Sequence, residues 1–553
     1  MPRLIVTVVA ACLLGACSDT HNRSAAPAVA GQSMTGVDVD RFRKDVEVLS
    51  SDEFAGRAPS SVGEELTVDY LVSQFEAAGA IGGNNGSFVQ DVALMSITPT
   101  DVSPLNFRND DVSVVLDIGD DAVVLTSRQV NSVAVTDSEV VFAGYGIVAP
   151  EYDWNDYEGI DVAGKTVVLL VNDPGYATGN DALFTGNKMT FYGRWSYKFE
   201  EAARQGAAGV IIVHETGAAG YPWGVVEGGW TGEQFTLQSD DRNAGRCAFE
   251  GWISGNAAAA LFAAFGHDFA ELVSLASSRE FSAIPLGASV STAIQSTLTP
   301  SVSQNVVALL PGAADDETVA FTAHWDHFGI VDNGEEDSIY NGAVDNATGT
   351  AALLEMARVL ADEPRRRSYL FLAVTAEESG LLGSAWFAEQ PTVSLARMAG
   401  LINIDAMNVH GATNDVTVIG YGSSELEDSL ARAAAGQNRV LVQEPTPEKG
   451  FFYRSDHFSF AKKGVPVLYA KGGVDHVEFG REYGLRVSEQ HIRERYHQAS
   501  DEIHDGWDWA GLEQDLNLYL GVARELAASD TWPDWLPTSE FHALRAQSDA
   551  QRR

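Results

Sequence analysis

Apolar residues recur at helical spacing in two segments near the start of the folded part of the chain. In residues 39–49 the apolar side chains fall three or four positions apart, which predicts a helix with one buried face. Residues 63–78 repeat this pattern, and Gly79 follows them as a helix stop. The loop between the two segments, residues 51–57, ends in Arg57, and the sequence leaves open whether this arginine lies on the surface or in a pocket.

The middle of the chain, residues 120–290, has a different pattern. Short apolar runs alternate with glycine-containing and Asn-Asp-Pro turns, which predicts a compact α/β module rich in strands. One helix is expected at residues 195–205 and a strand at residues 210–213. The histidines of this module, His214 and His267, stand alone, so we expect structural roles for both.

From residue 303 onward, apolar strands alternate with amphipathic helices. Near-continuous apolar strands between helices predict an α/β fold with a mixed, mainly parallel sheet that helices cover on both faces. Such sheets bind ligands outside the carboxyl ends of their strands. The expected strands are residues 305–310, 318–323, 368–375, 398–404, 416–419 and 465–468, and the expected helices are residues 350–360 and 381–389.

Residues of metal-ligand type stand at the ends of three of these strands. His324 follows one strand, the pair Glu377-Glu378 follows the next, and Asp405 follows a third. A single histidine or glutamate at a strand end is usually a surface residue. Three strand ends of one sheet that all finish in ligand types are much harder to explain in that way, so we expect a site at this edge.

Two more residues of the same type lie in loops. Asp345 precedes the helix expected at residues 350–360, and His497 lies in a late loop. With the residues at the strand ends they make two imidazoles and three carboxylates, enough for two metal ions that share one carboxylate. Glu377 is then left beside the set as a free carboxylate.

The adjacent pair Glu377-Glu378 would be costly in a cleft, because two like charges raise each other's pKa. A dication removes this difficulty for one carboxylate and leaves the other available as a base. The alternative is that both glutamates are solvated at a helix N-terminus, where the helix dipole favours negative charge.

Composition narrows the possible partners. The chain has 553 residues, 45% of them hydrophobic, and this suits a globular protein of more than one domain. Its formal net charge of −41 argues against nucleic acid and against an anionic membrane surface as partners. The acidic residues are spread along the chain, which is typical of a secreted protein kept soluble by its charge.

Residues 1–17 look like a targeting segment. A basic Arg3 precedes an apolar stretch that is too short to span a bilayer and that ends in Leu-Gly-Ala-Cys at Cys17. Small residues before a cysteine resemble a bacterial lipoprotein signal, with Cys17 as the lipidated residue; the alternative is an ordinary secretory peptide. Residues 18–36 have the composition of a tether. Cys247 then remains without a partner, so no internal disulfide is expected.

The ordered motifs of residues 303–530 resemble those of the bacterial double-zinc aminopeptidases, a family that also contains glutamate carboxypeptidase, relatives of glutaminyl cyclase and the transferrin receptor. The motifs that carry the resemblance are His324-Trp325-Asp326, Asp345-Asn346-Ala347-Thr348-Gly349, Glu377-Glu378-Ser379-Gly380-Leu381-Leu382-Gly383-Ser384, Asn403-Ile404-Asp405, Ser455-Asp456-His457 and Tyr496-His497.

The resemblance implies a separate role for each candidate ligand. His324 and Asp405 would hold one zinc ion, Glu378 and His497 the other, and Asp345 would bridge the two. Zinc rests on the resemblance, because imidazole and carboxylate ligands also accept Mn²⁺ or Co²⁺.

Three further residues receive catalytic roles from the resemblance. Glu377 would be the general base for the attacking water, and the carboxylate of Asp326 would orient His324. Tyr496 matches a tyrosine that, in some members, donates to the oxyanion.

Weaker expectations concern the pocket wall. Arg454 is a candidate for binding a terminal carboxylate, and Asp456 and His457 are candidate substrate-binding or wall residues. His327 is close to His324 but is not expected to be a ligand. Residues 471–494 read as a mobile loop over the site, in which His476 is solvated.

The resemblance extends to the middle module through Phe142-Ala143-Gly144-Tyr145-Gly146 and Gly206-Ala207-Ala208-Gly209, which are similar to the protease-associated domain inserted in this family. We therefore predict the following organisation: a lipoprotein signal peptide at residues 1–17, a flexible tether at 18–36, the N-terminal part of the peptidase domain at 37–120, a protease-associated insert at 121–295 and the di-zinc catalytic domain at 296–553.

These inferences predict a zinc metalloaminopeptidase that removes the N-terminal residue of peptides. It would be lipid-anchored in the bacterial cell envelope, on the periplasmic side of the outer membrane or at the surface. The alternatives are a carboxypeptidase or dipeptidase on the same site, and a non-catalytic binding protein with this fold. The oligomeric state is not determined by the sequence.

Overall fold

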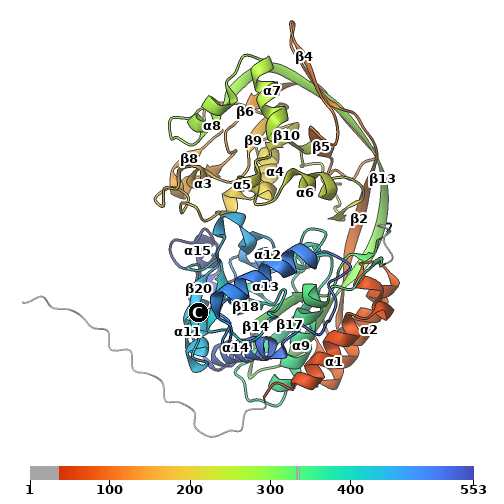
Figure 1. Ribbon diagram of the computed structural model, residues 1–553, viewed down its shortest axis with the longest axis vertical. Helices are drawn as coiled ribbons and strands as arrows, with labels where there is room; N and C mark the ends of the chain where they lie inside the picture. Colours follow the sequence, from red (N-terminus) through yellow and green to blue (C-terminus); the bar gives the residue numbers. More distant parts are fainter. Residues whose placement is uncertain (1–35, 332–333, 335–336, 553) are drawn as a thin grey trace, which may run out of the picture. The chain divides into compact units, whose positions relative to one another are not determined.

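The computed structural model describes residues 36–331, 334 and 337–552 (Figure 1). The predicted signal segment with Cys17 lies outside the described residues. The peptidase part contains a mixed sheet in which β17 (Arg367–Val374), β14 (Ala314–His324), β18 (Met398–Asn403) and β21 (Val467–Gly472) run parallel. The predicted fold class, a mainly parallel sheet flanked by helices, is confirmed.

Antiparallel strands extend this sheet at both edges. At one edge the end of β13 (Ile284–Leu310) pairs with β17. At the other edge β19 (Asp415–Ile419) pairs antiparallel with β21 and parallel with β20 (Val440–Gln443). The central strands are buried along their whole length, as expected for parallel strands covered on two faces.

Two hydrophobic cores cover the two faces of the peptidase sheet, because alternate residues of each strand point to opposite sides. Phe321 and Phe371 belong to one core, and Ala320 and Leu370 belong to the other. The helices of the first core are α1 (Val39–Leu49), α2 (Val62–Ala77), α9 (Thr348–Leu360), α11 (Leu426–Gly436) and α14 (Trp509–Ala528), and those of the second are α10 (Leu382–Glu389) and α12 (His457–Ala461).

A long antiparallel ribbon connects the peptidase sheet with the middle module. Strand β2 (Val89–Val102) pairs with β13 from Val306 back to Ile294, and β13 continues along β6 (Ser132–Phe142) of the middle module. Figure 1 shows β2 and β13 as two extended neighbouring strands. Along much of this part of β13, buried residues alternate with more exposed ones, so one face of the ribbon is covered. The central strands of the peptidase sheet are instead buried at every position.

The middle module has its own sheet and its own cores. Its strands β6, β9 (Thr166–Leu170), β10 (Gly209–Val213) and β12 (Phe249–Ile253) are parallel, and β5 (Ala122–Leu125) closes one edge. Strands β3 (Leu105–Arg108), β4 (Ser113–Leu116) and β11 (Gln234–Leu237) complete it, and its helices are α3 (Pro174–Thr178), α4 (Trp195–Arg204), α5 (Thr216–Ala219), α6 (Trp223–Gly229), α7 (Gly255–Ala264) and α8 (Phe269–Ala276). Leu105 and Leu116 lie in a core of this module, and its outer boundaries stay a prediction.

One expectation about the peptidase part is wrong. Residues 471–494, expected as a mobile loop, contain helix α13 (Gly480–Glu494). His476 is buried rather than solvated, because its Nδ1 accepts hydrogen bonds from the backbone of Glu478 and Phe479 and its ring stacks on Phe479. Helix α13 was missed in the sequence because its few apolar residues, Leu485, Val487 and Ile492, stand among many charged ones, and only Gly484 of the helix is buried.

Within the part of the chain that the structure describes, no single helix is both long and apolar enough to cross a bilayer. Helices α7 and α8 together reach the necessary length and apolar character, but they are bent by 108° relative to each other.

Candidate metal centre

The parallel register brings the predicted strand-end residues to one edge of the sheet. His324 is the last residue of β14 and lies beside Val374 of β17, whose chain continues to Glu377 and Glu378. Thr322 of β14 lies beside Asn403 of β18, two residues before Asp405. The sheet therefore assembles these side chains as the sequence pattern indicates.

Asp345 lies between two histidines. Its Oδ1 is 3.2 Å from Nε2 of His324, and its Oδ2 is 3.2 Å from Nε2 of His497. The remaining two carboxylates flank the histidines: Asp405 is 3.5 Å from Nε2 of His324, and Glu378 is 3.4 Å from Nε2 of His497. The five predicted ligands thus form two halves that share Asp345.

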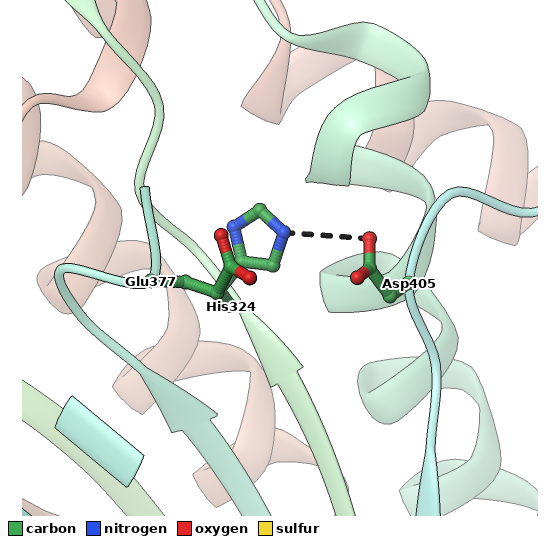
Figure 2. Close-up of side chains that lie close together, drawn as sticks. All are labelled: His324, Glu377 and Asp405. Carbon is green, nitrogen blue, oxygen red and sulfur yellow. Dashed lines mark ion pairs between the residues drawn. The ribbon is translucent and has the colours of Figure 1, made fainter. Parts of the chain in front are cut away.

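Glu377 reaches the same site from the loop after β17. Figure 2 shows its carboxylate next to His324 and Asp405, with a dashed line for the contact between the last two. One ligand-type atom from each of the three residues lies within 4.8 Å of the others, and the same holds for His324, Asp345 and Glu378. Glu377 is therefore close enough to act on a molecule held by the ligand set.

The donor set fits divalent metal ions. Asp345, Glu377, Glu378 and Asp405 place four carboxylates around the buried imidazole of His324. Burial raises the pKa of Glu377, His324 opposes this, and the neighbouring carboxylates raise the pKa further, to well above its usual range. Two dications would balance the charge of four carboxylates, and imidazole with carboxylate is a typical zinc donor set.

The tautomer of His324 also fits a metal ligand. Its Nδ1 lies 3.1 Å from the carbonyl oxygen of Asp326, which only accepts, so Nδ1 donates and Nε2 is the nitrogen that faces the carboxylates. Burial lowers the pKa of His324, but Glu377, Asp345 and Asp405 outweigh this and raise it well above 6.5. Without a metal the ring is therefore protonated and Nε2 donates toward Asp345 and Asp405; a cation between them would take the place of this proton.

The role predicted for Asp326 needs correction. Its carboxylate is 3.8 Å from Nδ1 of His324, too far for a hydrogen bond, and it accepts the backbone N–H groups of Glu377 (3.1 Å) and Glu378 (3.4 Å) instead. The backbone carbonyl of Asp326 orients His324, and its carboxylate positions the two glutamates.

The loop of Asp345 is held by two buried charged residues. Both oxygens of Asp501 accept the backbone N–H of Val344, and one accepts that of Asp345, at 3.0 to 3.1 Å. Arg57, only 1% exposed, donates to the carbonyls of Leu49, Trp325, Asn341 and Gly342. Arg57 is therefore neither a surface residue nor a substrate group; it ties the loops that carry His324 and Asp345 to the N-terminal segment.

Two further contacts position the ligands themselves. Ser455 donates to Oδ2 of Asp405 at 2.6 Å and accepts a hydrogen bond from Asn403. His327 lies with Nδ1 2.7 Å from Oε1 of Glu378, and burial lowers its pKa to about 4, so it is neutral and donates. His327 is thus a neighbour of a ligand rather than a ligand.

The predicted wall residues lie near the set in different ways. His457 is fully buried between the rings of Phe452 and Tyr469, with burial lowering its pKa to about 3. Asp456 is also fully buried, and burial raises its pKa to about 7. Neither side chain is exposed to a substrate in this structure. The side chain of Arg454, in contrast, is half-buried and lies over the ring of Phe451.

Tyr496 stacks on the ring of its neighbour His497 with a centroid separation of 3.8 Å. The residue is 36% exposed, yet burial of its hydroxyl, together with the charges of Asp345 and Glu378, raises the pKa of Tyr496 well above its usual range. Its predicted donation to an oxyanion stays a prediction.

Sequence reasoning missed Asp501, His327 and Ser455 as positioning residues. Asp501 offered no signal, because it is distant in sequence from the loop it holds. Ser455 stands within the quoted motif Ser455-Asp456-His457, and His327 directly follows the quoted motif His324-Trp325-Asp326.

The geometry agrees with comparisons to known proteins. Residues 305–521 match the sequence model of peptidase family M28. The chain is 34% identical to a "Probable zinc metalloprotease" of Leptosphaeria maculans over 150 residues. This stretch covers 26% of this chain and 35% of the relative. It is also 34% identical to "Aminopeptidase NAALADL1" of Mus musculus over 136 residues. This second stretch covers 23% of this chain and 17% of the relative. The chain thus aligns with about a third or less of these relatives.

A solved structure shares the fold over most of the chain. The aminopeptidase from Aneurinibacillus sp. strain AM-1 superposes with a TM-score of 0.50 at 21% identity, over 89% of this chain and 94% of that one. At this identity the similarity concerns the fold. The similarity to peptidase family M28 thus lies in residues 305–521, the part of the chain that carries the ligand set.

Proposed function

We propose that this protein is a metal-dependent aminopeptidase that hydrolyses the N-terminal bond of peptides. The observation that carries the proposal is the ligand set divided by Asp345 into two halves, with the carboxylate of Glu377 next to it. The names of the two relatives, a zinc metalloprotease and an aminopeptidase, support the same class of reaction.

Two zinc ions are the proposed cofactor, with Mn²⁺ or Co²⁺ as metals that the same donors accept. His324, Asp405 and Asp345 would hold one ion, and His497, Glu378 and Asp345 the other. When bound, the ions would polarise the scissile carbonyl and lower the pKa of the attacking water.

The protein's own groups then carry the proton. Glu377 accepts a proton from the attacking water as the new C–O bond forms, and it then passes this proton to the nitrogen of the leaving amine as the peptide C–N bond breaks. Asp326 holds the backbone of Glu377 through a 3.1 Å hydrogen bond, which fixes the position of this base. Tyr496 is the proposed donor to the oxyanion.

The test is hydrolysis of amino-acid nitroanilides, combined with metal analysis. A panel of free-amine nitroanilides should be hydrolysed by the metal-loaded protein, and a chelator should abolish the activity. Hydrolysis that survives chelation would contradict the metal-dependent mechanism. The absence of any hydrolysis by zinc-loaded protein would instead favour the non-catalytic alternative.

The main alternative is a carboxypeptidase or dipeptidase on the same site. For this alternative, half-buried Arg454 is the candidate residue for binding the terminal carboxylate of the substrate. Peptides blocked at the N-terminus separate the two. An aminopeptidase leaves them intact, whereas a carboxypeptidase cleaves them and is stopped by blocking of the C-terminus.

We also propose that Cys17 is lipidated and anchors the protein in a bacterial cell envelope, and that the middle module is a protease-associated domain. The apolar run before Leu-Gly-Ala-Cys supports the first proposal, and the Phe142-to-Gly146 motif supports the second. Incorporation of radioactive palmitate should be lost in Cys17→Ser; incorporation unchanged by this substitution would contradict lipidation at Cys17.

A further inference from the structure

Helix α13 is attached to the peptidase part by one narrow face. Gly484 is the only buried residue of this 15-residue helix, and a Cβ at this position would overlap the carbonyl oxygen of Val474. His491, seven positions later on the same face, packs its ring on that of His410 with a centroid distance of 5.7 Å. These contacts fix the helix on the surface and leave its opposite face to solvent.

The opposite face of α13 carries a stripe of alternating charge. Its four residues are Glu482, Arg486, Glu489 and Arg493, and all four are exposed. Their spacing of four, three and four positions places them one above another along the helix. The whole helix contains three arginines and three glutamates, so its charges balance although the chain has a net charge of −41. The repulsion that keeps copies of this chain apart is therefore weakest at α13.

The charges of this stripe are not matched within the helix. Among the residues that the structure describes, no ion pair involves Glu482, Arg486 or Glu489. Arg493 pairs with the adjacent Glu494 at 2.7 Å rather than with a glutamate of the stripe. A stripe that served only the stability of its own helix would pair each glutamate with the arginine four positions later. Its charges are instead available to a partner.

The stripe is complementary to itself in an antiparallel pair of helices. A twofold axis between positions 487 and 488 brings Glu482 of one copy opposite Arg493 of the second copy, and Arg486 opposite Glu489. Each of these two contacts occurs twice, which gives four Glu–Arg pairs. A shift of one helix by four positions brings like charges together, either Glu482 opposite Glu489 or Arg486 opposite Arg493. The charges therefore select one register.

Two apolar residues beside the stripe meet in the same register. Leu485 and Ile492 lie on one side of the stripe, and Ile492 is 60% exposed. Across the twofold axis, Ile492 of one copy falls within two positions of Leu485 of the second copy, which is about 3 Å along the helix axis. An exposed isoleucine would thus gain an apolar neighbour in addition to the ion pairs.

We propose that α13 is a dimerisation helix, which pairs in antiparallel orientation with α13 of a second copy of this chain. The helix is about 22 Å long, so the interface is small, and we expect a reversible dimer with a dissociation constant in the micromolar range. The chain passes from α13 to Tyr496 and His497, and the backbone N–H of Tyr496 donates to the carbonyl of His491. The dimer would therefore also hold the segment that leads to a predicted metal ligand.

The test is sedimentation velocity of the full-length chain carrying Cys17→Ser, which removes the proposed site of the lipid. With the stripe intact, this chain should form a species of twice the mass of one chain at concentrations up to about 100 µM. Arg486→Glu and Glu489→Arg each place like charges opposite each other in both central contacts. Each variant alone should therefore raise the dissociation constant about tenfold or more.

Mixing the two single variants separates pairing between copies from effects within one helix. In a mixed dimer the new glutamate of one variant faces the new arginine of the other, so the equimolar mixture should dimerise again. The double variant Arg486→Glu/Glu489→Arg should do so by itself. Lys44→Glu, at an exposed position of α1, is the control and should leave the dissociation constant unchanged.

Three results would overturn the dimerisation helix. The first is a chain with the intact stripe that stays monomeric at the highest concentration. The second is a dissociation constant that neither single variant changes. The third is a mixture and a double variant that both remain monomeric, because Glu–Arg pairs between copies would then not hold the dimer.

Discussion

Arg57 offers the most informative test of how the ligand loops are held. Substitution by methionine keeps the length and apolar stem of the side chain and removes all four hydrogen bonds to backbone carbonyls. Those carbonyls precede Asp345, follow His324 and end helix α1 at Leu49. The substitution therefore removes the hydrogen bonds of the Arg57 side chain to both ligand loops without touching a ligand, while Asn341 keeps its hydrogen bonds to Ser50 and Asp52.

The loss in the free energy of unfolding depends on how many backbone carbonyls are left without a donor. The carbonyl of Gly342 keeps the N–H of Ala347 as a second donor. The other three carbonyls, those of Leu49, Trp325 and Asn341, are left without the donor that Arg57 supplied. A buried carbonyl without a donor costs about 1 to 3 kcal/mol, and burial of the guanidinium, which the substitution relieves, offsets part of this. We expect Arg57→Met to lower the free energy of unfolding by about 3 kcal/mol.

The assay is urea unfolding of the metal-free protein, together with zinc affinity from competition with a chelator. Arg365→Met is the matched control, because Arg365 also donates to four carbonyls but is half exposed and precedes β17. Arg57→Met should shift the urea midpoint clearly more than Arg365→Met and weaken zinc binding about tenfold. Equal midpoints for the two variants and unchanged zinc affinity in Arg57→Met would refute this role of Arg57.

Three other predictions concern residues around the site. Ser455→Ala removes the 2.6 Å hydrogen bond to Asp405 and should weaken zinc binding about tenfold in a chelator competition; affinity equal to that of Ser529→Ala, a half-buried control directly after helix α14, would contradict this. His327→Ala releases Glu378 and should weaken zinc binding about 10- to 100-fold, whereas His267→Ala in the middle module should not. Burial lowers the pKa of His410 and His491, whose rings are 5.7 Å apart, from 6.5 to about 4. Their contribution to stability is complete above pH 6.5 and is lost as the pH falls toward 4, because the unfolded chain binds these protons first. Thermal melts of the double variant His410→Gln/His491→Gln should therefore change less between pH 7 and pH 4.5 than those of the wild type, and parallel curves would show that the pair does not contribute.

The strongly patterned parts of the chain were predictable because burial leaves a direct trace in the sequence. Helix α1 was expected at residues 39–49 and is found at Val39–Leu49, and the strands before His324 and Asp405 were expected within one residue of their ends. Because these strands are parallel neighbours, their carboxyl ends bring His324 and Asp405 to the same edge of the sheet.

Features that depend on distant contacts were not predictable. The role of Arg57 depends on carbonyls up to 285 residues away, which no local pattern reveals. Helix α13 buries a single glycine, and its few apolar residues are outnumbered by polar and charged ones, so the sequence marks it only weakly. The resemblance assigned the carboxylate of Asp326 to His324, yet the backbone N–H groups of Glu377 and Glu378 are closer to this carboxylate and donate to it.

The central claim is that Glu377 acts as a base beside a metal set to which it does not belong. The most direct measurement is kcat/KM of Glu377→Gln on leucine nitroanilide, with the zinc content of the same sample determined. Glutamine keeps the shape and removes the base, so we predict two zinc ions per chain, as in the wild type, and a loss of about 10² to 10⁴ in kcat/KM. Activity near that of the wild type at full zinc content would contradict the account.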